Sequence, residues 1–189
     1  MPITAVDARA ALVVIDLQQG LRDYPLLTPF ADIAERAAAL AAAFRAHGLT
    51  VVLVNADARP PGRTDQPRRA LAPSPGWTDL VPELDAQPSD LRLTKHAPGA
   101  FGDSPLAATL RERGVTQVLV VGVSTSNGVE STARAAFDLG LHVAVATDAV
   151  TDVDATFHDH AVARILPRMA ETGTTADVLA LLARRGSDA

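Results

Sequence analysis

Four short runs of apolar residues, separated by segments with helical periodicity, constrain the possible fold more than any other feature of this chain. The runs are AALVVID (10–16), TVVLVNAD (50–57), VLVVGV (118–123) and HVAVATDAV (142–150). Uninterrupted apolar runs of this length are typical of strands covered on both faces, as in a parallel sheet. Helical spacing follows over 29–47, 104–113 and 129–139, and each of these segments is followed by glycine, a common residue at helix ends.

Further elements continue the alternation. The sequence predicts short strands at 91–95 and near 171–172, and helices over 154–168 and 175–184. Strands that alternate with helices indicate right-handed βαβ crossovers and a parallel sheet. We therefore predict an α/β fold, a three-layer αβα sandwich, in one domain spanning residues 1–189. The segment 58–89, rich in proline and glycine, is predicted to be a long surface loop.

Composition narrows the classes of function. The chain of 189 residues carries a net charge of −5 without a large basic cluster, which argues against a nucleic-acid partner. It contains no cysteine, and this excludes disulfides, a cysteine nucleophile and cysteine metal ligands. No apolar run approaches the roughly 18 residues of a membrane span, and the N-terminal stretch reads as a core strand and not as a signal peptide. We expect a cytoplasmic protein that acts on small molecules without membrane attachment.

Polar residues at the ends of predicted strands are the first candidates for a site, because ligands of open α/β sheets bind outside the carboxyl ends of the strands. Asp16 follows five apolar residues, where partial desolvation suits a general acid or base; a helix cap or solvated acid is the alternative. Lys95 ends the strand at 91–95. It either stabilises a carboxylate or a developing anion, or is a surface lysine.

The turn STSNG (124–128) joins a strand to a helix, a favoured place for a nucleophile. Its backbone N–H groups are suited to bind an anion or a polarised carbonyl. As structure alone, Ser126 or Asn127 would be an ordinary N-cap. The helix opens on Gly128, which has no side chain to attack a substrate.

Metal and nucleotide sites are not predicted. No Asp-x-His pattern follows Asp57, and His158 and His160, two residues apart, do not share a helix face. His96 is interpreted as a loop residue. The segment GVSTSNG matches neither the dinucleotide-binding nor the P-loop pattern. We therefore expect no metal and no cofactor.

Taken together, these segments make the chain resemble the isochorismatase-like hydrolases over nearly its whole length. The matching segments are ALVVIDLQQG, KHAPGAFGDSPLAATLRERGVTQVLVVGVSTSNGVESTARAAFDLG and VATDAVTD, the last with its following histidine-containing helix. The resemblance implies a six-stranded, mainly parallel sheet and assembly into homo-oligomers, to which the apolar stretch Ala136–Leu141 is a candidate contributor. It also implies a cis peptide bond between Val123 and Ser124.

Most members of this family are cysteine amidohydrolases with an Asp–Lys–Cys triad. The resemblance places Asp16 and Lys95 on the first two positions and Gly128 on the third, so covalent amide hydrolysis is not expected. The isochorismatases of the family also have glycine there, and they hydrolyse a vinyl ether without an acyl-enzyme. By this resemblance a protonated Asp16 donates the proton, Lys95 orients Asp16 or the substrate, and backbone groups around Gly128 contact the substrate or position water.

Substrate contacts are implied for one residue near Asp16 and for four in or beside the turn: Gln18, Val123, Ser124, Ser126 and Asn127. The turn itself looks more like that of the cysteine hydrolases with only the nucleophile exchanged. Four arginines of the 58–89 loop are candidates for binding substrate carboxylates or are solvent-facing: Arg59, Arg63, Arg68 and Arg69.

Three functions stay open from the sequence. The first is a cysteine-independent hydrolase, possible substrates being an isochorismate-like enol ether or another small molecule. The second is a serine-dependent amidohydrolase that uses Ser126 or Ser124. The third is a catalytically silent ligand-binding or scaffold protein.

Overall fold

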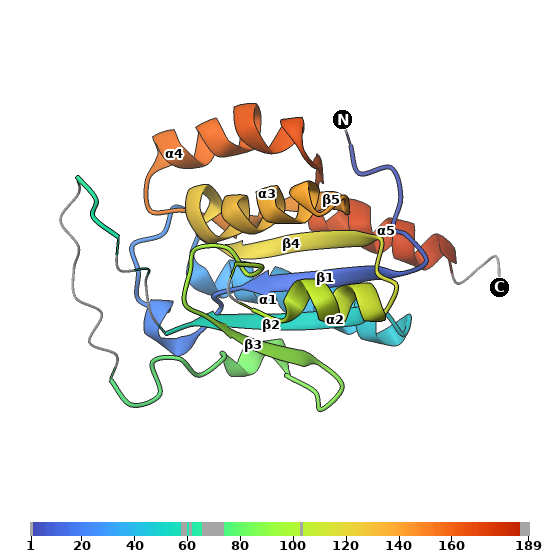
Figure 1. The fold of residues 1–189 in the computed structure, drawn as a ribbon, viewed down its shortest axis with the longest axis horizontal. Helices are drawn as coiled ribbons and strands as arrows, with labels where there is room; N and C mark the ends of the chain where they lie inside the picture. Colours follow the sequence, from blue (N-terminus) through green and yellow to red (C-terminus); the bar gives the residue numbers. More distant parts are fainter. Residues whose placement is uncertain (1, 58–59, 61, 66–73, 103, 186–189) are drawn as a thin grey trace.

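The centre of the molecule is a six-stranded sheet in which all neighbouring strands are parallel (Figure 1). The computed structural model describes residues 2–57, 60, 62–65, 74–102 and 104–185. The strands are β1 (Ala10–Ile15), β2 (Thr50–Ala56), β3 (Leu91–Lys95), β4 (Gln117–Val123), β5 (His142–Thr151) and β6 (Glu171–Gly173), in the spatial order β3-β2-β1-β4-β5-β6. The predicted α/β class and parallel sheet are confirmed, and the strand order, which periodicity does not supply, places β1 at the centre.

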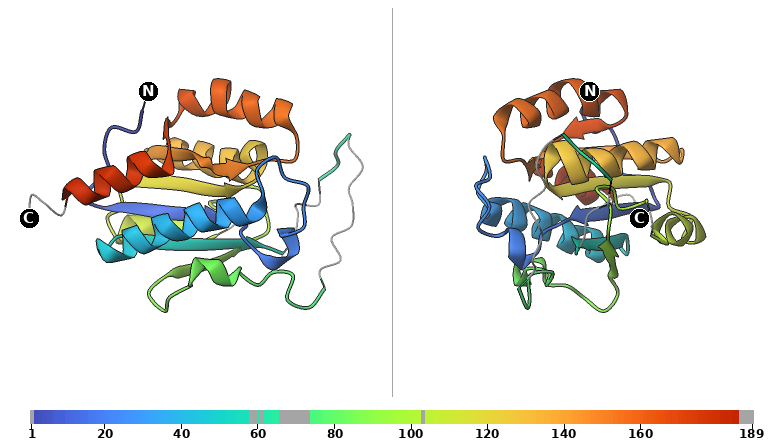
Figure 2. Two further views of the ribbon diagram at one scale, coloured as in Figure 1. Left: turned by 180° about the vertical axis from the view of Figure 1, so that it is seen from behind. Right: turned by 60° about the vertical axis from the view of Figure 1, so that its left-hand side comes forward.

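Helices cover both faces of this sheet. On one face lie α1 (Phe30–Ala46) and α5 (Thr175–Arg185), and on the other α2 (Leu106–Glu112) and α3 (Glu130–Asp138), as the front and rear views show (Figures 1 and 2). The side chains of β1 alternate between two cores. Leu12 and Val14 pack on the α1 side, and Val13 and Ile15 pack on the α3 side. Because both faces are covered, the strand has no polar face, and this explains its uninterrupted apolar sequence.

The segment predicted as one helix over 154–168 is less regular than its spacing indicates. It begins as α4 (Ala155–His160), continues as a π-helical turn η4 (Ala161–Ile165) and ends as a 3₁₀ turn η5 (Leu166–Arg168). Pro167 lacks a backbone N–H and so cannot continue a regular helix from within. Other short turns are η1 (Gln19–Leu21), η2 (Pro82–Leu84) and the π-helical η3 (Thr125–Val129). No helix among the described residues is long and apolar enough to span a membrane.

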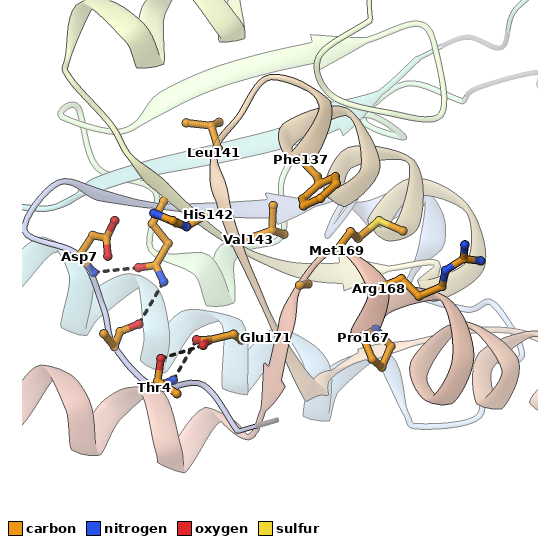
Figure 3. Close-up of a pocket in the computed structure, with 13 residues that line it drawn as sticks. Thr4, Asp7, Phe137, Leu141, His142, Val143, Pro167, Arg168, Met169 and Glu171 are labelled. Carbon is orange, nitrogen blue, oxygen red and sulfur yellow. Dashed lines mark hydrogen bonds between the residues drawn. The ribbon is translucent and has the colours of Figure 1, made fainter.

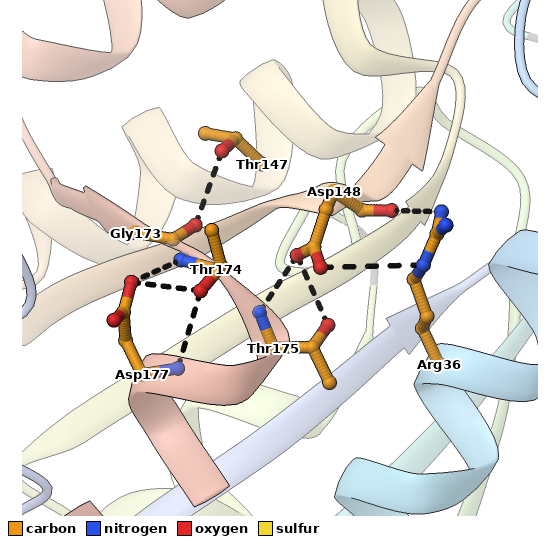
Figure 4. Close-up of polar contacts among 7 residues, drawn as sticks. All are labelled: Arg36, Thr147, Asp148, Gly173, Thr174, Thr175 and Asp177. Carbon is orange, nitrogen blue, oxygen red and sulfur yellow. Dashed lines mark hydrogen bonds and ion pairs between the residues drawn. The ribbon is translucent and has the colours of Figure 1, made fainter. Parts of the chain in front are cut away.

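Strand β5 carries an irregularity that reaches α5 and α1 (Figure 4). Its pairing with β4 shifts between Val145 and Val150, so the residues between them leave the regular ladder. Asp148, in this bulge, accepts hydrogen bonds from the backbone and hydroxyl of Thr175 at the start of α5, at 2.7 and 3.0 Å. Its carbonyl oxygen accepts a 2.7 Å bond from Arg36 of α1. The bulge therefore joins the sheet to two helices, and β5 resumes its pairing with β4 on the way to Asp152.

Candidate active site

Asp16 lies directly after β1, at the carboxyl edge of the sheet, in an unusual backbone conformation. Its φ angle is +55°, in the left-handed region that few residues other than glycine, asparagine and aspartate adopt. Two backbone hydrogen bonds hold it: the Asp16 N–H donates to Val54 O at 2.8 Å, and the Gln18 N–H donates to Asp16 O at 3.0 Å. Non-glycine residues in this region cluster at functional sites, where the surrounding structure imposes the conformation.

The carboxylate of Asp16 forms a buried ion pair with Lys95, the last residue of β3. Lys95 Nζ lies 2.8 Å from Asp16 Oδ2, and the two residues are 4% and 8% exposed. Lys95 also donates to Ala97 O at 3.3 Å. The structure thus joins two residues 79 positions apart in the sequence, and the surface-lysine alternative for Lys95 is wrong.

The two oxygens of Asp16 have different surroundings. Oδ2 is bound to Lys95, whereas Oδ1 is buried and has no hydrogen-bond partner among the described residues. Burial raises the pKa of Asp16 to about 6, and the charge and hydrogen bond of Lys95 offset only part of that increase. Asp16 is therefore suited to exchange a proton near neutral pH, with Oδ2 bound to Lys95 and Oδ1 enclosed by the protein without a hydrogen bond.

The STSNG turn is a π-helical turn between β4 and α3, and the peptide bond between Val123 and Ser124 is cis, as the family resemblance implies. Both the N–H and the hydroxyl of Ser126 donate to Asp152 Oδ2, each at 2.7 Å. Thr125, which is fully buried, shares a 2.9 Å hydrogen bond with His158 of α4. The N-cap of η3 is Ser124 and the N-cap of α3 is Val129, neither with a side-chain capping bond, so the N-cap alternative for Ser126 or Asn127 is wrong.

Gly128 is buried beside the ion pair. A Cβ atom added here would lie 3.4 Å from Asp16 Oδ2 and 2.9 Å from Ile15 Cγ2. The position therefore faces the Asp16 carboxylate, and any side chain on it requires Ile15 to move. One turn later, the Thr132 hydroxyl donates to Gly128 O at 2.7 Å and accepts from Ala100 N at 3.1 Å, which joins the turn to the loop after Lys95.

A second glycine brings β4 close to β1. Gly122 has a φ angle of +114°, and a Cβ atom on it would overlap the backbone oxygen of Ile15. Only glycine fits this approach. The contact places the end of β4, and with it the STSNG turn, next to the residue that precedes Asp16.

Gln18 lies near Asp16, but its side chain is directed into the protein. The residue is 0% exposed, and its amide exchanges hydrogen bonds with the backbone of Ala56 and donates to Trp77 O. Both amide donor bonds are made to backbone oxygens, so the sequence-based interpretation of Gln18 as a substrate contact does not fit its surroundings.

The remaining polar candidates are the histidine and acid near the ends of β3 and β2 and the arginines of the 58–89 loop. His96 and Asp57 form an exposed pair 2.5 Å apart, and no group of three potential metal ligands occurs among the described residues. Arg63 is exposed. The remaining loop arginines, Arg59, Arg68 and Arg69, lie outside the described residues.

Sequence reasoning missed three residues that shape the site: Asp152, Thr132 and His158. Asp152 is 3% exposed and accepts a hydrogen bond from Ser126. In the sequence, nothing distinguishes it from the other acidic residues near the end of β5. Its position at the end of β5 is the same signal that pointed to Asp16. Thr132 and His158 lie within helices, and no spacing rule distinguishes them from neighbouring polar residues.

A cavity of about 410 Å³ lies at the opposite edge of the sheet (Figure 3). Its lining includes Gln117, His142 and Glu171, the first residues of β4, β5 and β6. Phe137 and Met169 supply apolar surface. Because Asp16 and Lys95 follow or end their strands, this cavity is separate from the ion pair.

Comparison with known proteins identifies the family to which this chain belongs. The family model for the isochorismatase domain matches residues 10–177. An uncharacterised isochorismatase family protein of Escherichia coli O157:H7, YecD, is 36% identical over 176 residues, which are 89% of this chain and 94% of that protein. The chain belongs to the isochorismatase-like hydrolase family.

Solved structures and characterised relatives agree with this assignment. An isochorismatase family protein from Burkholderia thailandensis superposes with a TM-score of 0.91 at 35% identity, covering 95% of this chain and 98% of that one. Streptothricin hydrolase of Streptomyces noursei is 33% identical over 145 residues, 76% of this chain and 50% of that protein. Enzymes of the family are hydrolases that act on small molecules.

Proposed function

We propose that this protein is a small-molecule hydrolase that works without a cysteine nucleophile and uses Asp16 as its proton donor. One observation carries the proposal: Asp16 is buried, Lys95 holds one carboxylate oxygen at 2.8 Å, and the other oxygen has no partner among the described residues. A carboxyl group with a pKa of about 6 carries and releases a proton near neutral pH. The chain has no cysteine, and glycine stands at position 128 facing this carboxylate.

Hydrolysis of an enol ether fits these groups, because it needs an acid and water but no covalent intermediate with the protein. The protonated Asp16 carboxyl gives its proton to the β-carbon of the enol ether, and the remaining cation is an oxocarbenium ion. Water adds to the cationic carbon and returns a proton to the Asp16 carboxylate. As the bond from the hemiketal carbon to the alkoxy oxygen breaks, the hemiketal hydroxyl loses its proton and the alkoxy oxygen gains one, so an alcohol leaves and a ketone remains.

Lys95 and Gly128 have supporting roles in this proposal. The Lys95 ammonium stabilises the carboxylate that forms when Asp16 gives up its proton. Gly128 places backbone and no side chain beside Asp16 Oδ2, and we assign the backbone groups of Val123, Ser124 and Asn127 in and beside the same turn to contacts with the substrate or with water.

Ser126 is a poor nucleophile in this geometry. Its hydroxyl donates to Asp152, and the histidine of the neighbouring helix, His158, bonds Thr125 instead. A serine nucleophile needs a base that accepts its proton and is itself regenerated, as histidine does in serine hydrolases. We therefore do not assign the serine-dependent amidohydrolase function.

Turnover of isochorismate, measured beside a panel of small amides, tests the proposal. We expect wild-type protein to hydrolyse the enol ether and Asp16→Asn to lose about 100-fold or more in kcat/KM while remaining folded. Because the protonated carboxyl is the active form, kcat/KM should fall as pH rises through about 6. A rate that rises through the same pH would instead make Asp16 a base.

Gly128→Cys is the matched variant for the amide panel. Its Cβ would lie 3.4 Å from Asp16 Oδ2, and Ile15 would have to shift to admit it. A gain of amidase activity in this variant would show that only the nucleophile separates the site from the cysteine hydrolases. Tight ligand binding without turnover by wild type on every compound would favour a ligand-binding protein and contradict the proposal.

A further inference from the structure

The Gln18 side chain links the loop after β1 to the end of β2. Its Oε1 accepts from the Ala56 N–H at 2.7 Å, and its Nε2 donates to Ala56 O at 3.0 Å and to Trp77 O at 3.3 Å. The residue is fully buried, so water does not compete for these bonds. One amide thus binds both backbone groups of a single residue on the neighbouring strand.

Ala56, the residue that Gln18 binds, lies at the strand end between Asp16 and Lys95. Ala56 is the last residue of β2, the strand that separates β1 from β3, and it is in register with Lys95. The Asp16–Lys95 pair must therefore cross the end of β2 to form. A shift of Ala56 relative to the loop after β1 would change the separation of the two charged groups.

The backbone of Gln18 is hydrogen-bonded to Asp16, the other member of the ion pair. Its N–H donates to Asp16 O at 3.0 Å and closes a three-residue turn that begins at Asp16, whose backbone is left-handed. Gln18 thus contacts Asp16 through its main chain and the strand beside Lys95 through its side chain.

We infer that Gln18 is a positioning residue whose side-chain amide, bound to both backbone groups of Ala56, sets the distance between the Asp16 carboxylate and the Lys95 ammonium. Its catalytic consequence rests on the proposed function of Asp16, whereas its effect on the ion pair does not. Residues that act this way matter because misplacement of a catalytic group by about 1 Å costs on the order of 100-fold in rate.

Asn55 provides a matched control. Its Nδ2 donates to Thr78 O at 2.7 Å, so it also ties the end of β2 to the segment around Trp77. No hydrogen bond links its side chain to Ala56 or to the Asp16 loop. Asn55→Leu removes a side-chain bond of the same kind from the same region.

The test compares Gln18→Met with Asn55→Leu by ¹³C NMR titration of the Asp16 carboxyl and by steady-state kinetics. Methionine keeps the length of glutamine but makes none of its three bonds. If Lys95 moves away from Asp16, the ionised carboxylate loses stabilisation, so we expect the Asp16 titration midpoint to rise in Gln18→Met and to stay unchanged in Asn55→Leu. We expect kcat to fall about tenfold in Gln18→Met, with KM changed less than about twofold.

The two measurements separate the possible failures. An unchanged Asp16 midpoint in Gln18→Met, or an equal change in both variants, would overturn the positioning role whatever the activity. A raised midpoint in a protein without enol-ether activity would support the positioning role and contradict the proposed function. If Gln18→Met does not fold, Gln18→Asn, whose amide is one methylene too short to reach both groups of Ala56, serves for the same titration.

Discussion

Strand β3 has a buried ion pair near each end, and the two pairs differ in how their carboxylates are satisfied. Before the strand, Asp90 accepts from Arg45 Nε and Nη2 at 3.0 and 2.8 Å and from the Gln87 N–H at 2.8 Å. Both of its oxygens are therefore bound. At the other end, Asp16 shares one oxygen with Lys95 and leaves Oδ1 without a partner among the described residues.

This difference separates a structural ion pair from a reactive one. A bidentate arginine and a backbone N–H fix Asp90 completely, and its carboxylate has no free position for a ligand. The point charge of Lys95 on one oxygen of Asp16 does not offset the cost of burial, and the pKa of Asp16 therefore rises to about 6. Incomplete satisfaction of a buried carboxylate therefore brings its proton exchange close to neutral pH.

The largest expected change in stability comes from the satisfied pair. Asp90→Asn leaves the partly buried Arg45 guanidinium without its counter-charge, and loss of one partner from such a pair costs roughly 3 to 5 kcal/mol. Urea denaturation at pH 7 would measure this loss. The variant should retain turnover under native conditions, and a loss of kcat in the folded variant would remove the distinction between the two pairs.

For the Asp16–Lys95 pair, we expect ionisation of the carboxyl to lower the free energy of unfolding and not to raise it. In the folded protein the pKa of Asp16 is raised from 3.8 to about 6, so the folded state binds the proton more tightly than the unfolded state. Its contribution to stability is present below pH 4 and is lost as pH rises through about 6, a change of up to about 3 kcal/mol. Asp16→Asn, which stays neutral, should lack this component.

Paired denaturation of wild type and Asp16→Asn between pH 4 and pH 7.5 isolates the pH-dependent effect, because titratable groups away from the Asp16–Lys95 pair cancel in the difference. The variant should gain stability relative to wild type as pH rises. The change with pH is diagnostic and the absolute difference is not, because Asp16→Asn also leaves the buried Lys95 ammonium without its counter-charge. A difference in stability that stays constant between pH 4 and pH 7.5 would contradict the raised pKa of Asp16.

The smallest effect is expected where a carboxylate holds the turn. Ser126→Ala removes the 2.7 Å hydroxyl bond to Asp152 but keeps the backbone bond to the same oxygen. We expect a loss of about 1 kcal/mol in the free energy of unfolding and a severalfold decrease in kcat, because the turn beside Gly128 is held less firmly. Complete loss of activity together with loss of acylation by an activated ester would instead identify Ser126 as a nucleophile.

Sequence reasoning located Asp16 and Lys95 because each terminates an apolar strand, and strand ends of an α/β protein gather at one edge of the sheet. The same reasoning misjudged Gln18, since a polar residue two positions from a candidate acid looks like a ligand contact. Its burial against Ala56 depends on which strand lies beside β1. Asp152 was missed although it also follows a strand, because several acids occur around β5.

The layered α/β class follows from the sequence alone, since uninterrupted apolar strands require cover on both faces and the segments with helical periodicity supply that cover. The sequence also determined that no cysteine attacks a substrate, because the chain contains none. The contact of Lys95 with Asp16 across the end of β2, and the lack of a hydrogen-bond partner for Asp16 Oδ1 among the described residues, emerge only in the folded chain. Strand order and burial control these contacts, and both arise from packing between residues far apart in the chain.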